Sequence, residues 1–113
     1  MELLLIVLNK TEYLEKLIST LIEAGIQGVT ISDSEGIGHY LAFEVPIFAG
    51  LRQFFQEGKS ISKTILAVLE DEESYLNFKK LIAQEGLDFT QPGVGIMAKI
   101  PAVEIIKSQD EME

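Results

Sequence analysis

The sequence predicts an α+β sandwich in which two helices pack on one face of an antiparallel sheet. Two observations predict this class: short apolar runs of strand length alternate with longer amphipathic segments, and 47% of the 113 residues are hydrophobic. The expected order is strand, helix, strand, strand, helix, strand, with an inserted helix or loop between strands 2 and 3. A chain of this length holds one hydrophobic core, so we expect residues 1–113 to form a single domain.

Composition excludes several classes of function. The sequence has no cysteine, which removes disulfides, thiolate metal ligands and cysteine nucleophiles. Eighteen acidic against nine basic side chains give a formal net charge of −9. Such a chain has no broad basic surface for a nucleic acid, and a charged ligand would need a small local positive site.

The first strand is expected at Leu3–Leu8, which is apolar at both parities. Its six residues are too few for a signal-peptide core or a membrane span, and Glu2 stands where a signal peptide carries a cation. We therefore interpret the run as a buried strand of a cytoplasmic protein.

A helix should follow, capped by Asn9 and completed as a capping box by Glu12. Gly25 is suited to ending it in the left-handed conformation, before a second strand at Ile26–Ser32. The apolar side chains of this helix recur at helical spacing: Leu14, Leu17, Ile18, Leu21 and Ile22.

The middle of the chain is less regular. A polar exit over Ser32–Gly38 leads to an amphipathic helix predicted at Pro46–Phe55, with Gly58 as a stop signal. The aromatic stripe of Phe43–Phe55 is interpreted as core, packed on its own subunit or on a neighbouring one, in preference to a partner-docking surface. His39 is read as a lone loop histidine, because no second ligand stands at helical spacing from it.

The second half repeats the strand and helix pattern. A third strand at Ile61–Leu69 is followed by four carboxylates, Glu70–Glu73, at the positive end of a helix closed by Gly86. The last strand should span Ile96–Ile100, with Val103–Ile106 as a short strand or edge piece. The helix should bury Tyr75, Phe78, Leu81 and Ile82.

This order closes most simply as the ferredoxin-like βαββαβ sandwich. Two helices cover one face of the sheet, yet the first and third strands are apolar on both faces. Leaving such side chains in water would cost several kcal/mol, at ~1.5–3 kcal/mol each. We therefore expect other copies of the chain to cover the second face, helped by the inserted helix.

Two stretches resemble the nitrogen regulatory PII signalling proteins. Leu8–Gly38 contains Gly-Ile-Gln-Gly-Val-Thr-Ile and then Gly-Ile-Gly, which match that family's second strand and the entry to its long loop. The likeness resumes at Gly93–Met97 and at Ile100–Ile106, in the register of the family's glycine loop and Pro-Val-Glu tail.

The resemblance implies a homotrimer of ferredoxin-like subunits that binds an adenine nucleotide in each intersubunit cleft. It also implies that the 39–60 segment signals to a protein target, by binding and without catalysis. The residues expected nearest the ligand are Gly28, Thr30, Gly36, Gly38, Gly93, Gly95 and Lys107.

Departures from the family pattern weaken phosphate binding. Ile96 stands where ATP-binding members carry Lys, and Lys107 and Gln109 replace two Arg. Losing cations removes charge-assisted hydrogen bonds to phosphates, which favours a mono- or diphosphate, or a ligand without phosphate, over ATP. The family's modifiable tyrosine has no clear counterpart, which argues against uridylylation.

Two alternatives stay open. The chain is either a sensor or an interaction trimer that has lost nucleotide binding. A third and weaker possibility is a related trimer such as the divalent-cation tolerance proteins. One histidine and no cysteine would give copper or zinc poor ligands. We expect no metal site, no catalytic constellation and no nucleic-acid partner, and membrane contact only through a membrane-protein partner.

Overall fold

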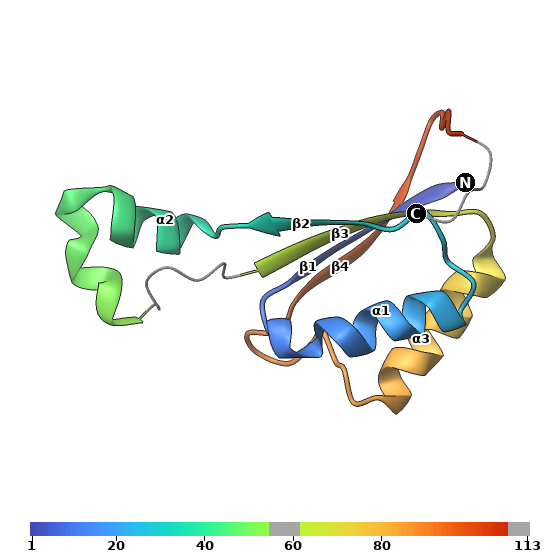
Figure 1. Ribbon diagram of the computed structural model, residues 1–113, viewed down its shortest axis with the longest axis horizontal. Helices are drawn as coiled ribbons and strands as arrows, with labels where there is room; N and C mark the ends of the chain where they lie inside the picture. Colours follow the sequence, from blue (N-terminus) through green and yellow to red (C-terminus); the bar gives the residue numbers. More distant parts are fainter. Residues whose placement is uncertain (55–61, 109–113) are drawn as a thin grey trace.

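The computed structural model describes residues 1–54 and 62–108. Its elements, in order, are β1 (Glu2–Leu8), η1 (Thr11–Tyr13), α1 (Leu14–Glu23), β2 (Thr30–Ser34), α2 (Ile37–Glu44), η2 (Pro46–Phe54), β3 (Ser62–Leu69), α3 (Glu72–Gln84) and β4 (Gly95–Pro101), where η denotes a 3₁₀ helix. The sheet has the order β2-β3-β1-β4 with every pairing antiparallel, which confirms the ferredoxin-like α+β fold. Helices α1 and α3 cover one face, and the extended β2–β3 pair carries α2 at its far end (Figure 1).

The core lies between the two helices and one face of the sheet. Alternate residues of β1 and β3 point into it because successive strand side chains face opposite ways. Phe78 and Ile82 of α3 are buried as predicted, with Tyr75 and Leu81 half-buried at their side. The strand side chains buried in this core are Leu4, Ile6, Leu8, Ile65, Ala67 and Leu69.

The start of the first helix differs from the prediction. Asn9 forms no capping box; its backbone N–H donates to the Val94 carbonyl at 2.8 Å, which ties it to the loop before β4. The chain then makes the η1 turn, and α1 begins only at Leu14 without a side-chain cap. Ile22, which continues the helical spacing of the apolar side chains, is 69% exposed.

The second strand begins later than predicted. The Ile26 N–H donates to the Leu21 carbonyl at 3.0 Å and so completes the end of α1. Gly28 then takes a positive φ of 66°, which an extended strand does not accommodate. Pairing with β3 therefore starts at Thr30 and runs to Ser34, two residues beyond the predicted end.

The inserted segment holds a helix that the sequence pattern missed. Residues Ile37–Glu44 form α2, so His39 lies in a helix and is buried, contrary to the loop interpretation. Next, Pro46–Phe54 forms a 3₁₀ helix in place of the predicted amphipathic α-helix. Phe55, Gly58 and Ile61, which the predictions included, lie outside the described residues.

The chain after β4 forms no strand in the part that the structure describes. Val103 and Ile106 are 106% and 87% exposed, so the predicted edge strand at Val103–Ile106 is wrong. This segment rises on the side of the sheet opposite to α1 and α3 (Figure 1). Within the described ranges, none of the helices is both long and apolar enough to cross a bilayer.

Candidate functional site

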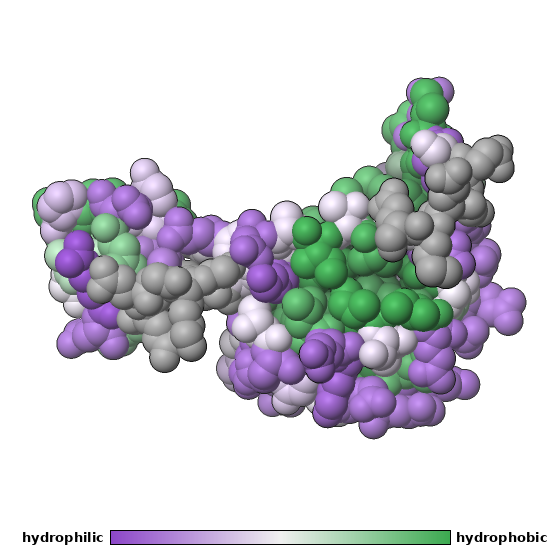
Figure 2. Space-filling view, viewed as in Figure 1, coloured by the Kyte–Doolittle hydropathy of each residue, from purple (hydrophilic) through white to green (hydrophobic). Residues whose placement is uncertain are grey.

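The face of the sheet opposite to the helices is apolar and uncovered by any described helix. Register places Leu5 beside Leu66 on β3 and beside Ala98 on β4, all facing away from the helices. On this open face Leu66 is 42% exposed and Ile96 is 63% exposed. Monomers rarely leave apolar surfaces of this kind in water, so the open face has the character of an interaction surface. A second apolar area is visible in Figure 2 below the strands, on the side of the sheet that carries α1.

A cluster of hydroxyl groups lies where the open face meets the arm, the segment beyond β2 that holds α2 and η2. The Oγ atoms of Ser34 and Ser62 are 2.8 Å apart, and Thr64 Oγ1 donates to Ser34 Oγ at 2.8 Å. Ser62 Oγ also lies 3.2 Å from the Ser34 carbonyl oxygen, to which it donates. The sequence prediction missed these residues, although the alternation of hydroxyl side chains along β2 could have indicated them. The cluster cross-links β2 to β3 at the base of the arm.

The arm beyond β2 and β3 has a small core of its own, formed by α2 and η2. The Arg52 Nε–H donates to the Ala42 carbonyl at 2.9 Å, and its guanidinium carbon lies 5.6 Å from the Phe43 ring centroid. His39 packs on the Phe43 ring with centroids 4.6 Å apart, and its Nδ1 bonds to the Glu35 carboxylate. These contacts tie the 3₁₀ helix to α2.

The arm exposes several apolar side chains. Among the described residues of the aromatic stripe, Phe43 is half-buried within the chain, whereas Phe48 and Phe54 are 42% and 70% exposed in a single chain, so packing of these two rings on a neighbouring copy stays a prediction. Between residues 36 and 54 the sequence has one acidic and one basic side chain, Glu44 and Arg52. The arm is therefore neutral, and the net charge of −9 belongs to the rest of the chain.

The glycine loop before β4 approaches β1 closely. A Cβ on Gly95 would lie 2.0 Å from the Val7 carbonyl oxygen, and the φ of this residue is +146°. Gly93, two residues earlier, also has a positive φ, of 77°. Glycine is thus required for the backbone path here before any ligand is considered.

Within one chain the predicted site residues are spread over the sheet. β2 pairs with β3, β3 with β1, and β1 with β4, and these registers bring two pairs of predicted residues to the same end of the sheet. One pair is Gly36 and Gly38, at the base of the arm, and the other is Gly93 and Gly95. These two pairs stand at opposite edges, separated by three strand spacings or about 14 Å.

The remaining predicted residues lie elsewhere. Gly28 precedes the edge strand and Thr30, exposed, begins it. Lys107 lies at the other end of the sheet, where its Nζ is 3.7 Å from a carboxylate oxygen of Glu70, just after β3. A single chain therefore brings Gly36 and Gly38 together and Gly93 and Gly95 together, but does not bring all seven residues into one cavity.

The sheet order and the two covering helices define a ferredoxin-like α+β fold. The chain is similar to the PII protein of Arabidopsis thaliana, solved as a crystal structure bound to citrate, with a TM-score of 0.57 and 19% sequence identity. The likeness covers 94% of this chain and 80% of that chain, and at this identity it establishes a divergent PII-like fold. No protein-family model and no curated protein matches the sequence.

Proposed function

We propose that the chain is a trimeric regulatory protein that binds a small metabolite or an adenine nucleotide in clefts between subunits and signals through its arm. The observation that carries this proposal is the open face, where apolar side chains of three strands lie uncovered in a folded chain. Other copies of the chain can cover this face without any change to the helices. The similarity to a PII protein supports a regulatory fold of this kind.

The proposed ligand site uses the seven residues Gly28, Thr30, Gly36, Gly38, Gly93, Gly95 and Lys107. Because they occupy both edges and both ends of the sheet, one site that contains them all requires more than one subunit. The glycine loop can present backbone N–H groups to an anion. The hydroxyl cluster at the arm base adds neutral donors and acceptors.

The arm is the proposed contact with a protein target. Its exposed apolar side chains stand away from the sheet, on a segment with no net charge. Membrane anchors of this length carry several cations, which favours a protein surface as the partner. The exposed side chains of the arm are Ile37, Tyr40, Ile47, Phe48 and Phe54.

Two measurements on the purified chain test this proposal. Sedimentation at micromolar concentration should give a trimer; a well-folded single subunit would contradict the shared cleft. Titration calorimetry with AMP, ADP, ATP, cyclic nucleotides and citrate should give saturable heat from at least one of them. No heat from any would refute sensing of these ligands and leave the assembly standing.

A second candidate is an interaction trimer that has lost nucleotide binding. Ile96, 63% exposed, places an apolar side chain where ATP-binding PII proteins carry Lys, and the Lys107 ammonium is already near Glu70. Deleting residues 42–58 separates the candidates. If the chain is a sensor, the deletion leaves its ligand affinity unchanged or lowers it. If the chain is an interaction trimer whose cleft is filled by the arm, the deletion raises its ligand affinity.

A further inference from the structure

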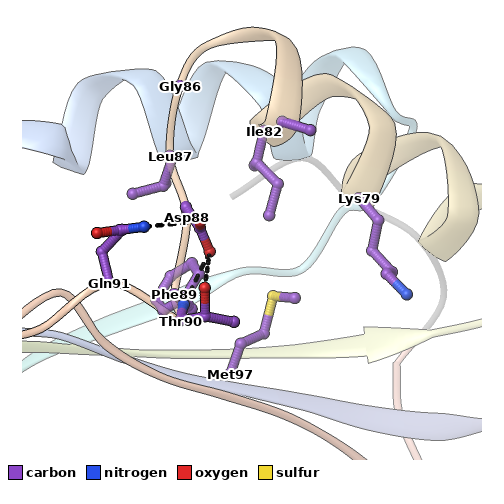
Figure 3. Close-up of a pocket in the computed structure, with 10 residues that line it drawn as sticks. Lys79, Ile82, Gly86, Leu87, Asp88, Phe89, Thr90, Gln91 and Met97 are labelled. Atoms are coloured by element: carbon purple, nitrogen blue, oxygen red, sulfur yellow. Dashed lines mark hydrogen bonds between the residues drawn. The ribbon is translucent and has the colours of Figure 1, made fainter.

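A pocket of about 610 Å³ lies on the helix side of the sheet, between α3, the following loop and β4. Its volume is within the range of small-molecule sites in proteins. Ile82 and Met97 point into the space from opposite walls (Figure 3). The pocket is lined by Lys79, Ile82, Ala83, Gly86, Leu87, Asp88, Phe89, Thr90, Gln91 and Met97.

The floor of this pocket is apolar. Ile82 and Leu87 are 5% and 3% exposed, and Phe89 and Met97 are half-buried against the same core. An apolar ligand body would therefore replace water on carbon surfaces and contact a polarisable thioether. Met97 pairs with the buried Ile6, so the pocket lies on the helix side of the sheet and is not part of the open face.

Two opposite charges lie at different sides of the rim. Asp88 is engaged by its own loop: its Oδ1 accepts from the Thr90 N–H at 2.9 Å and from Thr90 Oγ1 at 2.6 Å, and its Oδ2 accepts from Gln91 Nε2 at 3.4 Å. These bonds, led by that from the Thr90 hydroxyl, lower the pKa of Asp88 below its ordinary value of 3.8. The carboxylate thus stays ionised to hold the loop.

Among the described residues, Lys79 forms no ion pair with a carboxylate. In the part of the chain that the structure describes, its contact is with an aromatic face, the Tyr75 ring, whose centroid lies 5.6 Å from Nζ. By contrast, the ammonium groups of Lys63 and Lys99 are each bonded to a carboxylate. Lys79 therefore offers donors at the mouth of an apolar pocket, where an anionic group can accept them.

We propose that this pocket binds a small apolar monocarboxylic acid, with its hydrocarbon body on Ile82, Leu87, Phe89 and Met97 and its carboxylate on Lys79. This inference does not depend on the proposed function, because it needs neither the trimer nor the intersubunit cleft.

Methionine methyl NMR provides a direct test. The sequence has three methionines, so the [¹³C-methyl]-methionine spectrum has three signals. Of Met1 and Met97, the two methionines in the described residues, Met97 lines the pocket. Hexanoate and 3-phenylpropanoate are added to the full chain, with hexylamine and hexan-1-ol as cationic and neutral counterparts. The proposal expects a saturable shift of the Met97 signal with the acids, at lower concentration than with either counterpart, and no matching shift of Met1.

Two pairs of variants locate the binding. Ala83→Phe fills the pocket from an exposed helix position and should abolish the shift, whereas Gln84→Phe, exposed on the same helix outside the pocket, should not. Lys79→Gln should weaken acid binding by about two- to fivefold, the range of an exposed ion pair, and Lys80→Gln should leave it unchanged.

Two results would overturn the proposal. The absence of a saturable Met97 shift with both acids refutes the site. Equal binding of hexanol or hexylamine, or equal effects of the two lysine variants, refutes recognition of a carboxylate by Lys79. Both readouts are independent of oligomeric state and nucleotide binding, so failure here is distinct from failure of the proposed function.

Discussion

The two faces of the sheet have similar composition and opposite surroundings. Along β1, Leu4, Ile6 and Leu8 are fully buried under the helices, whereas the alternate residues from Leu3 to Val7 face the open side and are half-buried. In the part of the chain that the structure describes, helices cover one face of the sheet. The comparison indicates that the covered face determines the fold of the chain, and that the open face is the candidate surface for the proposed assembly.

The largest effect is expected from the covered face. Ile6→Ala removes a fully buried side chain and should lower the free energy of unfolding by about 2–5 kcal/mol. Urea unfolding followed by circular dichroism measures this loss. Val7→Ala, on the open face of the same strand, is the matched control and should cost less at protein concentrations below those that support assembly. Equal losses at such concentrations would contradict the contrast between the faces.

The open face should control assembly. Leu66→Glu places a carboxylate on a partly exposed position of β3, and burying it against another copy leaves an unpaired charge. We expect the association constant, measured by sedimentation, to fall by at least about 100-fold, which corresponds to roughly 2.7 kcal/mol. The circular dichroism spectrum should keep its folded shape.

The control for this change is Ile22→Glu on α1. Ile22 is more exposed than Leu66, at 69% against 42%, but lies on the helix side. Its substitution should leave the sedimentation coefficient unchanged. Dissociation by both variants, or by neither, would show that the open face is not the assembly surface.

The junction between β1 and β4 supports both faces and should be sensitive to one added methyl group. Gly95→Ala puts a Cβ against the Val7 carbonyl oxygen at a φ of +146°, which should cost about 1–3 kcal/mol of unfolding free energy. Gly36→Ala is the matched control, because its φ is −71° and no atom lies within 4 Å of the added Cβ. Thermal unfolding of the two variants separates a backbone requirement from a general cost of replacing glycine.

The strand and helix order could be predicted because each body element has a strong period. Leu3–Leu8 and Ile65–Leu69 are continuous apolar runs, and the covering helices place apolar residues on one side. The arm lacks this signal: α2 has apolar side chains around much of its circumference, and its stability depends on contacts with η2 through Arg52. Contacts between segments ten residues apart leave no period in the sequence.

The candidate site was predictable only as a set of residue types. Glycines in a recognisable order indicate where the backbone turns, and Gly93 and Gly95 do adopt positive φ. Their distance from Gly36, in contrast, depends on strand order, which places three strand spacings between them. The pocket beside α3 depends on a loop folded around Asp88, where hydrogen bonds between near neighbours, with no hydrophobic period, determine the shape.

The smallest expected effect concerns how the two covering helices begin. Asp71 Oδ1 accepts from the Ser74 N–H at 2.7 Å at the start of α3, so Asp71→Ala should lower the unfolding free energy by about 1 kcal/mol. Asn9 is also a preferred capping residue and has Glu12 three residues later, but it makes no cap, so Asn9→Ala should change stability by no more than a few tenths of a kcal/mol. Urea unfolding of both variants measures the difference. A loss of about 1 kcal/mol in Asn9→Ala would indicate that the capping box predicted from the sequence does form, and that α1 begins before Leu14.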